Sequence, residues 1–399
     1  MTTFNAAEQA GNYFQTDTSL AEIERKQQKA ANTSGDPVKF PSKILAVSVF
    51  DQAGDVVFVA EAGGSASGVR LSTNQRSTTP RGPQAPLTCL AFAGVQSNSV
   101  SHIYSGCWDK SIWRYSFQGT TFSDQSSFLA HRDFVKCLLV APTPDKQQIL
   151  ISGGADGDIR FWSLDGQPVG SIKPGARGIE CLVLDPLSSP DSPAVLASTS
   201  KQEIFSFSIP ALQNIAAHRF ELTPPIMAHA TSVYKLHFDE DGDLWTASAD
   251  KTAKHLLRTE GWRVDTTLTH PDFVRDVVTH GRYGWVITAC RDENVRVWNM
   301  ATGDLYHVFT GHYEEVTGLA VTGDLVISVS IDATLRRWSL APVDLRKAVE
   351  EAKNPKLLEQ EPEPDVDMGM LTAEEEAELR ALMESEEEET LEKIAMDQQ

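Results

Sequence analysis

Serine, histidine, aspartate and tryptophan recur in this sequence at spacings that invite a catalytic interpretation. The stretch "ISGGADGDIRFWSL" (residues 151–164) places Ser152 four residues before Asp156 and ten before Trp162, and His131 lies upstream. A hydroxyl, an imidazole and a carboxylate are the groups of a nucleophilic hydrolase triad. These residue types therefore raise the hypothesis of an acyl-transfer enzyme. Whether the hypothesis holds depends on how often the set occurs in the chain.

The same constellation is repeated along the chain. The sets are His131, Ser152, Asp156 and Trp162; His270, Thr288, Asp292 and Trp298; His312, Ser328, Asp332 and Trp338; and His229, Thr246 and Asp250, with Leu256 in place of the Trp. A hydrolase needs one triad that faces a pocket, not several copies at a fixed repeat. We therefore interpret the sets as architecture and expect no catalytic residue.

Each set lies within a repeating series of strands. A Val stands four residues after each of the four His, and an alternating apolar segment typical of a strand follows it. A second strand carries the Ser or Thr, a tight turn carries the Asp, and a third strand carries the Trp. A weaker unit keeps Ser105 and Asp109 with Tyr115 at the Trp position, and two more fit by strand pattern only, one of them with Lys201 in place of the Asp and Phe207 in place of the Trp.

The seven units start near residues 43, 86, 131, 175, 229, 270 and 312, a period of about 40 residues that is typical of four-stranded units. The His, the Asp in the turn and the Trp resemble those of the WD-repeat family, whose members fold as β-propellers. The resemblance covers roughly residues 41–340. It implies an all-β, seven-bladed propeller in which each set is a hydrogen-bonded structural tetrad. Residues 36–42 are a candidate for the strand that closes the ring, and an extra blade or an open ring are the alternatives.

Charge and composition divide the chain further. Residues 341–399 hold 19 acids and 6 bases, a net −13, so the other residues carry only −7 of the total −20. We expect a flexible polar N-terminal segment, partly disordered, over 1–35, a propeller over 36–342, and an acidic, partly helical tail over 343–399. We expect residues 343–360 of the tail to form a helix broken at Pro355, and a short amphipathic helix to begin at the capping box of Thr372 and Glu375.

Several functional classes find no support in the sequence. No apolar run reaches the roughly 18 residues of a membrane span, and the N-terminus lacks the apolar core of a signal peptide. The five cysteines form no Cys-x-x-Cys pair, and no Gly-rich phosphate loop or metal motif is present. We expect no cofactor, no metal, no membrane contact, and a cytoplasmic or nuclear location.

The family resemblance also places a partner-binding face. In such propellers, the loops that lead into the first strands and the turns between second and third strands lie on one face of the ring. The candidates at these positions are Trp108, Phe134, Lys136, Tyr234, Phe273, Arg275 and Arg291. Aromatic and Arg side chains dominate binding hot spots. We expect a peptide with apolar anchors and acidic groups there, and nucleic acid only indirectly.

The function predicted on these grounds is a non-enzymatic scaffold in a multiprotein complex. The acidic tail favours an assembly factor or chaperone for a basic client protein, and a tail that only solubilises the protein, with no specific target, is the alternative. A subunit of an RNA-processing, ribosome-biogenesis or chromatin complex is an alternative. A ubiquitin-ligase substrate receptor is less favoured because the blade ends "WSLD", "WNMA" and "WSLA" lack Trp-Asp-x-Arg. A propeller hydrolase is the least favoured alternative.

Overall fold

The computed structural model describes residues 24–27, 29–49, 54–79, 82–94, 102–118 and 121–353. The chain comprises two compact units, residues 1–347 and 348–399. The predictions for residues 1–23 and for the tail after Lys353, the amphipathic helix after Thr372 included, lie outside the described residues. Of the helix predicted over 343–360, the part before Pro355 is present as α3 (Pro342–Lys353), and the rest lies outside the described residues.

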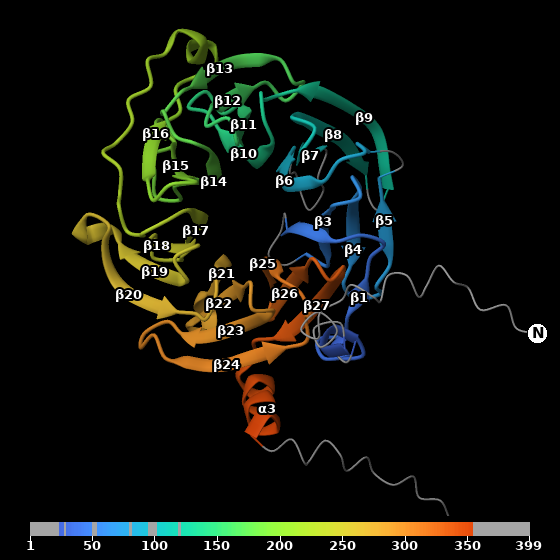
Figure 1. Cartoon of the computed structure of the whole chain (residues 1–399). Coiled ribbons are helices and arrows are strands. Elements are labelled where there is room, and N and C mark those ends of the chain that lie inside the picture. Colours follow the sequence, from blue (N-terminus) through green and yellow to red (C-terminus); the bar gives the residue numbers. More distant parts are fainter. Residues whose placement is uncertain are drawn as a thin grey trace, which may run out of the picture. The chain divides into compact units, whose positions relative to one another are not determined.

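The described strands of the first unit form seven antiparallel sheets, the blades, arranged around a central axis (Figure 1). This arrangement confirms the predicted seven-bladed propeller. Blades 1 to 3 contain β2 (Ile44–Ser48), β3 (Val56–Glu61), β4 (Ala66–Arg70) and β5 (Arg76–Thr78); β6 (Leu87–Ala93), β7 (His102–Cys107), β8 (Ser111–Gln118) and β9 (Thr121–Leu129); and β10 (Val135–Pro142), β11 (Gln148–Gly154), β12 (Ile159–Trp162) and β13 (Pro168–Ile172).

The remaining blades continue in chain order. Blades 4 to 7 contain β14 (Ile179–Leu184), β15 (Ala194–Thr199) and β16 (Ile204–Ser208); β17 (Val233–Phe238), β18 (Leu244–Ser248), β19 (Thr252–Leu257) and β20 (Arg263–Thr269); β21 (Val274–His280), β22 (Trp285–Cys290), β23 (Asn294–Asn299) and β24 (Leu305–Thr310); and β25 (Val316–Thr322), β26 (Leu325–Ser330), β27 (Thr334–Ser339) and β1 (Val38–Lys39). The 3-10 helices are η2 (Leu212–Ala217), η3 (Arg258–Glu260) and η4 (Gly281–Tyr283).

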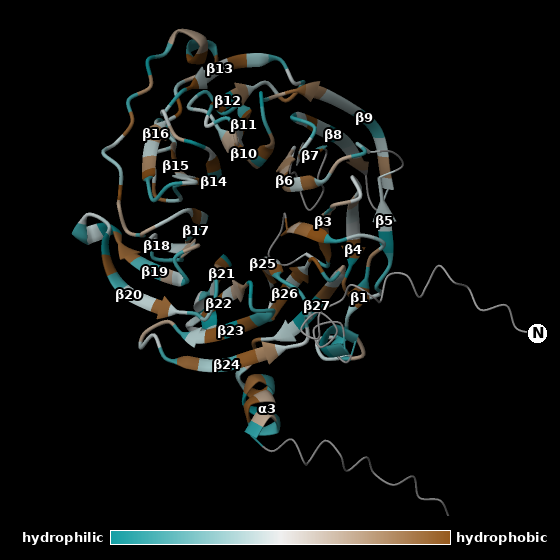
Figure 2. Ribbon diagram, viewed as in Figure 1, coloured by the Kyte–Doolittle hydropathy of each residue, from teal (hydrophilic) through white to brown (hydrophobic). Residues whose placement is uncertain are grey.

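The position of a strand within its blade explains its sequence. Second strands such as β22 and β18 are buried along their whole length, so they read as continuous apolar runs. Outer strands such as β20 alternate exposed and covered residues, and Figure 2 shows this as alternating teal and brown along β20. The apolar cores lie between neighbouring blades. The core between blades 3 and 4, for example, contains Phe161 and Phe207.

The strand that closes the ring comes from the N-terminal segment. Val38 and Lys39 of β1 pair with Leu335 and Thr334 of β27, so the first described strand completes the last blade. Residues 36–42 therefore supply the closing strand, as one of the sequence-based alternatives held. Because β1 provides the outer strand of blade 7, the ring closes without an extra blade.

Blade 4 departs from the predicted four strands. Its sheet has three strands within the described residues, and residues 209–228 run past β16 as η2 and extended chain. Ile226 forms an isolated bridge with Ile204, and Phe220 stacks on Phe161 with ring centroids 4.9 Å apart. Pro224 and Pro225 follow Thr223 directly, and a proline has no N–H to donate to a strand ladder. A fourth strand therefore cannot continue through this segment.

Candidate partner-binding face

The repeated His, Ser and Trp side chains of blade 3 form one directed hydrogen-bond chain. The indole Nε1 of Trp162 donates to Ser152 Oγ at 2.9 Å, and Ser152 Oγ lies 2.8 Å from Nε2 of His131. Nδ1 of His131 lies 2.9 Å from a carboxylate oxygen of Asp156. Because the Asp156 carboxylate only accepts, the proton of the neutral imidazole sits on Nδ1, and the serine hydroxyl donates to Nε2. Burial lowers the pKa of His131, which keeps this neutral form.

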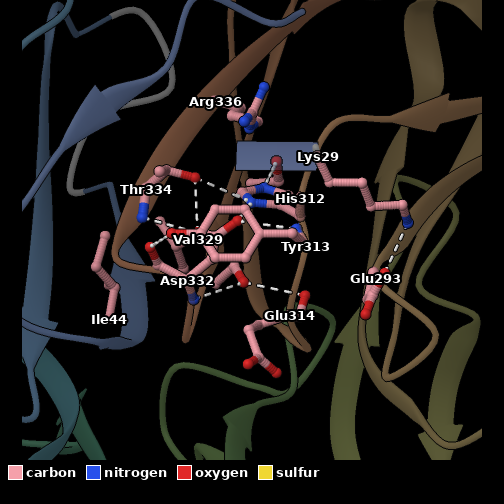
Figure 3. Close-up of polar contacts among 12 residues, drawn as sticks. Lys29, Ile44, Glu293, His312, Tyr313, Glu314, Val329, Asp332, Thr334 and Arg336 are labelled. Carbon is pink, nitrogen blue, oxygen red and sulfur yellow. Dashed lines mark hydrogen bonds and ion pairs between the residues drawn. The ribbon is translucent and has the colours of Figure 1, made fainter. Parts of the chain in front are cut away.

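Blades 7 and 5 repeat the arrangement. In blade 7, Nδ1 of His312 lies 2.8 Å from Asp332, and Trp338 and His312 both contact Ser328 at 2.8 Å. Figure 3 shows His312 with Asp332 and the bond from Thr334 to His312. In blade 5, His229 lies 2.7 Å from Thr246 and 2.9 Å from Asp250, while Leu256 fills the Trp position as a buried apolar side chain.

The predicted tetrad is wrong for blade 6. His270 and Trp298 contact Thr288 at 2.8 and 2.9 Å, but Nδ1 of His270 is directed to the carbonyl of Leu268. Asp292 instead accepts two N–H groups of Arg296, at 3.0 and 2.5 Å. The Arg296 guanidinium, four residues after Asp292, thus binds the carboxylate in place of the His270 imidazole. Burial and the nearby Arg296 charge lower the pKa of His270 to about 4.

Blade 2 keeps only part of the set. Ser105 Oγ and Tyr115 Oη are buried and have no hydrogen-bond partner among the described residues. Asp109 is exposed and accepts bonds from Ser111 and Trp113 of its own hairpin. Blade 2 has Tyr115 at the Trp position and no His. Its Ser105 and Tyr115 hydroxyls therefore lack the hydrogen bonds to an imidazole and an indole that the tetrads of other blades provide. Burial raises the pKa of Tyr115 accordingly.

The tetrads offer no access to a substrate. Ser152, Thr246, Thr288 and Ser328 are all fully buried, and each hydroxyl already contacts an imidazole. A nucleophile must reach the reacting carbonyl, which these hydroxyls cannot do. Across the described ranges, no group of three or more His, Cys, Asp or Glu side chains is arranged to hold a metal ion. Nor is any described helix long and apolar enough to cross a membrane.

A β-bulge at the start of every blade positions the face residues. In all seven first strands the register shifts between the first residue and the third, so the residue between them is left without a partner. A bulge of this kind re-aims one side chain. The seven residues are Leu45, Thr88, Lys136, Glu180, Tyr234, Arg275 and Thr317, which we call the bulge ring. All seven line one central cavity of about 780 Å³.

Neighbouring members of the bulge ring contact one another or the next blade. Lys136 Nζ lies 2.5 Å from Glu180, and the Arg275 guanidinium lies over the Tyr234 ring at 4.4 Å. Thr88 donates to the carbonyl of Val135, and Thr317 donates to the carbonyl of Ile44. Each of these contacts joins two adjacent blades. Three of the predicted face residues, Lys136, Tyr234 and Arg275, thus lie at one cavity mouth.

The other predicted aromatic residues form two further pairs on this face. Trp108, in the turn after β7, stacks on Phe134, directly before β10, with ring centroids 5.0 Å apart and an interplanar angle of 16°. Their exposed fractions are 47% and 39%. Arg291 lies over the Phe273 ring at 5.3 Å. The structure therefore brings six of the seven predicted residues together in three pairs, while Lys136 pairs with Glu180. Trp108 and Phe134 are the most exposed of the aromatic side chains among them.

Acidic neighbours change the expected charge of the face. Arg275 pairs with Glu315 at 2.7 Å, as Lys136 pairs with Glu180. Arg291 lies 4.0 Å from both Asp272 and Glu315. These pairings satisfy the bases within the protein and leave little net positive charge for an acidic ligand. The structure thus supports the aromatic side chains of this face as partner contacts, and it gives less support to the prediction that the partner carries acidic groups.

The cavity behind the face contains an ion pair between a partly exposed lysine and a buried aspartate, and the described residues of the other blades do not repeat it. Lys235 Nζ lies 3.6 Å from Asp276, which raises the pKa of Lys235. Asp276 also accepts the backbone N–H groups of Val277 and Leu319, at 2.8 and 2.9 Å. The carboxylate is thus shared by blades 5, 6 and 7 and is saturated with donors. This geometry joins three blades through one carboxylate.

A basic segment near the N-terminus was missed at the sequence level. Arg25 and Lys29 contact Glu293, and Lys26 contacts Glu314, on the same face as the predicted residues. The sequence did contain a signal for this segment, since three bases lie within five residues of a chain whose net charge is −20. Their acidic partners lie more than 260 residues away, so no local pattern pairs them.

Comparison with known proteins identifies the repeat. The family model described as WD domain, G-beta repeat matches residues 122–163, 262–299 and 303–339. These segments contain all four residues of the repeated sets in blades 3, 6 and 7.

Curated relatives extend the match over most of the chain. An uncharacterized WD repeat-containing protein of Schizosaccharomyces pombe is 31% identical over 343 residues, covering 82% of this chain and 88% of that protein. Rat striatin is 24% identical over 274 residues, 66% of this chain but 29% of striatin, so the chain spans less than a third of striatin's length. A tRNA (guanine-N(7)-)-methyltransferase non-catalytic subunit, wuho, of Drosophila willistoni is 42% identical over 74 residues, 18% of each protein.

A solved structure supports the fold independently. The crystal structure of the WD40 beta propeller domain of Doa1 superimposes with a TM-score of 0.63 at 17% identity, covering 79% of this chain and 99% of that one. At this identity the likeness concerns the fold alone.

Proposed function

The chain belongs to the WD-repeat family, whose propellers generally serve as protein-interaction scaffolds, and from this membership we propose that it holds a partner protein on the face that carries the bulge ring. The scaffold is non-enzymatic. Its partner contacts are the aromatic groups of that face and the residues that surround the cavity mouth.

One observation carries this proposal. Trp108 and Phe134 come from different blades, stack in parallel and remain 47% and 39% exposed. Large aromatic side chains at a surface bury much area on binding at a small cost in side-chain entropy, which makes them frequent anchors of interfaces. Because each ring holds the other in place, the pair is arranged before a partner arrives, and less freedom is lost on binding.

The tetrads support a non-catalytic role. Their hydroxyls are buried and hydrogen-bonded, and the Lys235–Asp276 pair in the cavity is saturated by backbone donors. The wuho relative is named a non-catalytic subunit, which fits a propeller that acts by binding. The hydroxyls of the tetrads, on which the hydrolase alternative depends, are fully buried.

The acidic tail suggests a second contact. Residues 341–399 carry a net charge of −13, and a chain of like charges binds basic surfaces through long-range attraction. We propose that the tail recruits a basic client, so that the protein serves as an assembly factor or chaperone in the cytoplasm or nucleus. Membership of an RNA-processing, ribosome-biogenesis or chromatin complex is the alternative, and a ubiquitin-ligase receptor is less favoured because Trp-Asp-x-Arg is missing.

Quantitative affinity purification tests both contacts. Four versions are compared: the full chain, a chain ending at residue 345, the full chain with Trp108→Ala and Phe134→Ala, and the full chain with Leu305→Ala. Leu305 is an exposed leucine of the outer strand β24 and serves as the matched control. We expect the double variant to lose a set of partners that the control keeps, and the truncated chain to lose basic proteins. Equal recovery in all four versions would refute the proposal.

A further inference from the structure

The N-terminal segment is bound to the partner face by ion pairs. Residues 24–27 and 29–30 are helical. Both guanidinium nitrogens of Arg25 contact the Glu293 carboxylate at 2.7 Å, and Lys29 Nζ contacts the same carboxylate at 2.7 Å. Lys26 Nζ lies 2.5 Å from Glu314. Figure 3 shows Lys29 extended toward Glu293.

The spacing of the three bases matches the two acids. Residues four apart share one side of a helix, so Arg25 and Lys29 meet one carboxylate while Lys26 projects to another. Glu293 lies in the turn between β22 and β23 of blade 6, and Glu314 lies in the loop before β25 of blade 7. The helical segment therefore bridges two blades on the face that carries Arg291 and Phe273.

The contacts that hold the N-terminal segment to the propeller are stronger after Asn32 than before it. From Asn32 onward the chain is fixed: Arg336, itself 1% exposed, donates to the carbonyls of Asn32 and Ser34, and Gly35 lies against the Trp338 ring. Before Asn32, the bases are between a third and a half exposed. Exposed ion pairs contribute little and weaken with salt. Residues 24–30 can therefore leave without opening the ring at β1.

Departure of the segment changes the charge of the face. Glu293 is 8% exposed and its pKa is lowered by the N–H groups of Arg25 and Lys29. Without those bases, Asp272, Glu293, Glu314 and Glu315 outnumber Arg275 and Arg291. A basic helix from another protein would find the same two carboxylates at the same spacing.

We propose that the loop face of blades 6 and 7 is a docking site for a basic helical segment of a partner protein, and that residues 24–30 occupy it as an internal ligand until the partner displaces them. The inference rests on the proposed function, since it names the partner chemistry of one part of the same face. Glu293 is the central acceptor, and Glu314 sets the direction of the bound helix.

The test uses a labelled synthetic peptide of residues 20–31 as the probe and measures its fluorescence anisotropy at low salt. Three full-length proteins are compared: the wild type, an open variant with Arg25→Gln, Lys26→Gln and Lys29→Gln, and the open variant with Glu293→Gln added. Because a tethered segment competes at a high effective concentration, the open variant should bind the probe about tenfold more tightly than the wild type. Glu293→Gln should reverse that gain.

The controls make the result specific. Asp165→Asn in the open variant removes an exposed acid of a different turn and should leave probe binding unchanged. A peptide with Gln in place of its three bases should not bind. Circular dichroism and thermal melting establish that every variant is folded. Equal probe binding by the wild type and the open variant, or no effect of Glu293→Gln, would overturn the inference. Such a failure would leave the Trp108 and Phe134 experiment unaffected, so the two proposals fail separately.

Discussion

Trp108 stacks on Phe134 across the boundary between blades 2 and 3, with centroids 5.0 Å apart and planes inclined by 16°. Neither side chain is part of an apolar core, since both remain more than a third exposed. The stack therefore adds little to folding and leaves two ring faces at the surface. Substitution of Trp108 or Phe134 can therefore test partner binding without unfolding the protein.

Removal of Trp108 should hardly affect stability. Trp108→Ala is expected to change the free energy of unfolding by about 1 kcal/mol or less, since surface changes are small. Trp162→Ala removes a side chain that is 5% exposed and should cost about 3 to 5 kcal/mol. Urea unfolding of both variants gives the comparison. A large loss for Trp108→Ala would mean that the stack is part of the core and not a binding surface.

The carboxylate of a complete tetrad should matter more than that of an incomplete one. Asp332 is buried and accepts bonds from His312, Tyr313 and Thr334, so Asp332→Ala should cost about 3 kcal/mol. Asp109 stands at the same turn position of blade 2 but is exposed and has no imidazole partner, so Asp109→Ala should cost less than about 1 kcal/mol. Similar losses in thermal melts would contradict the structural role of the tetrad.

Acid should destabilise the ring through its buried histidines. Burial lowers the pKa of His270 and of His237 to about 4 in the folded chain, from an ordinary value of 6.5. Below pH 6.5 the unfolded chain takes up these protons first, so stability is full above that pH and falls as the pH drops toward 4. The loss approaches about 3 kcal/mol for each group.

Unfolding in urea at several pH values between 7.5 and 4.5 measures this slope. His270→Gln should lower stability at neutral pH and flatten the acid loss. His218→Gln removes an exposed histidine and is the matched control. A slope that His270→Gln leaves unaltered would show that other groups cause the acid sensitivity.

Closure of the ring should depend on Gly35. Its φ is +73°, and a Cβ there would come within 2.8 to 2.9 Å of the Trp338 ring. Gly35→Ala should therefore cost about 2 to 3 kcal/mol, since a left-handed conformation and a steric clash act together. Gly284 has a φ of +65° with nothing within 4 Å, so Gly284→Ala should cost only about 1 kcal/mol. Equal melting temperatures for the two variants would argue against the role of Gly35.

The repeat could be predicted from the sequence because its signal is local. Each Val four residues after a His marks the first residue of an inner strand, as Val135, Val233, Val274 and Val316 do in the structure. The Ser or Thr and the Trp lie ten residues apart on paired strands, which brings them to bonding distance. Positions fixed by strand register are thus readable from spacing alone.

Other features depend on competition between distant or alternative partners. Asp292 was expected to bond His270, but Arg296 offers two N–H groups and takes it. Of the bulge ring, Lys136, Tyr234 and Arg275 were predicted as face residues. Their contacts were not predicted, because Lys136–Glu180 and Arg275–Glu315 form between units about 40 residues apart. The fourth strand expected in blade 4 fails because prolines interrupt the segment. The ion pairs of Arg25, Lys26 and Lys29 join the two ends of the propeller and have no local signature.

Site-specific photo-crosslinking tests the central claim, that the bulge-ring face binds a protein partner, most directly. A photoreactive phenylalanine analogue replaces Phe134 in one protein and Tyr306 in another; Tyr306 is 37% exposed on the outer strand β24 and serves as the control. Illumination in lysate of the native cell should give a discrete crosslinked product from position 134 that position 306 does not give. The absence of a crosslink at position 134, or identical products from both positions, would contradict the account.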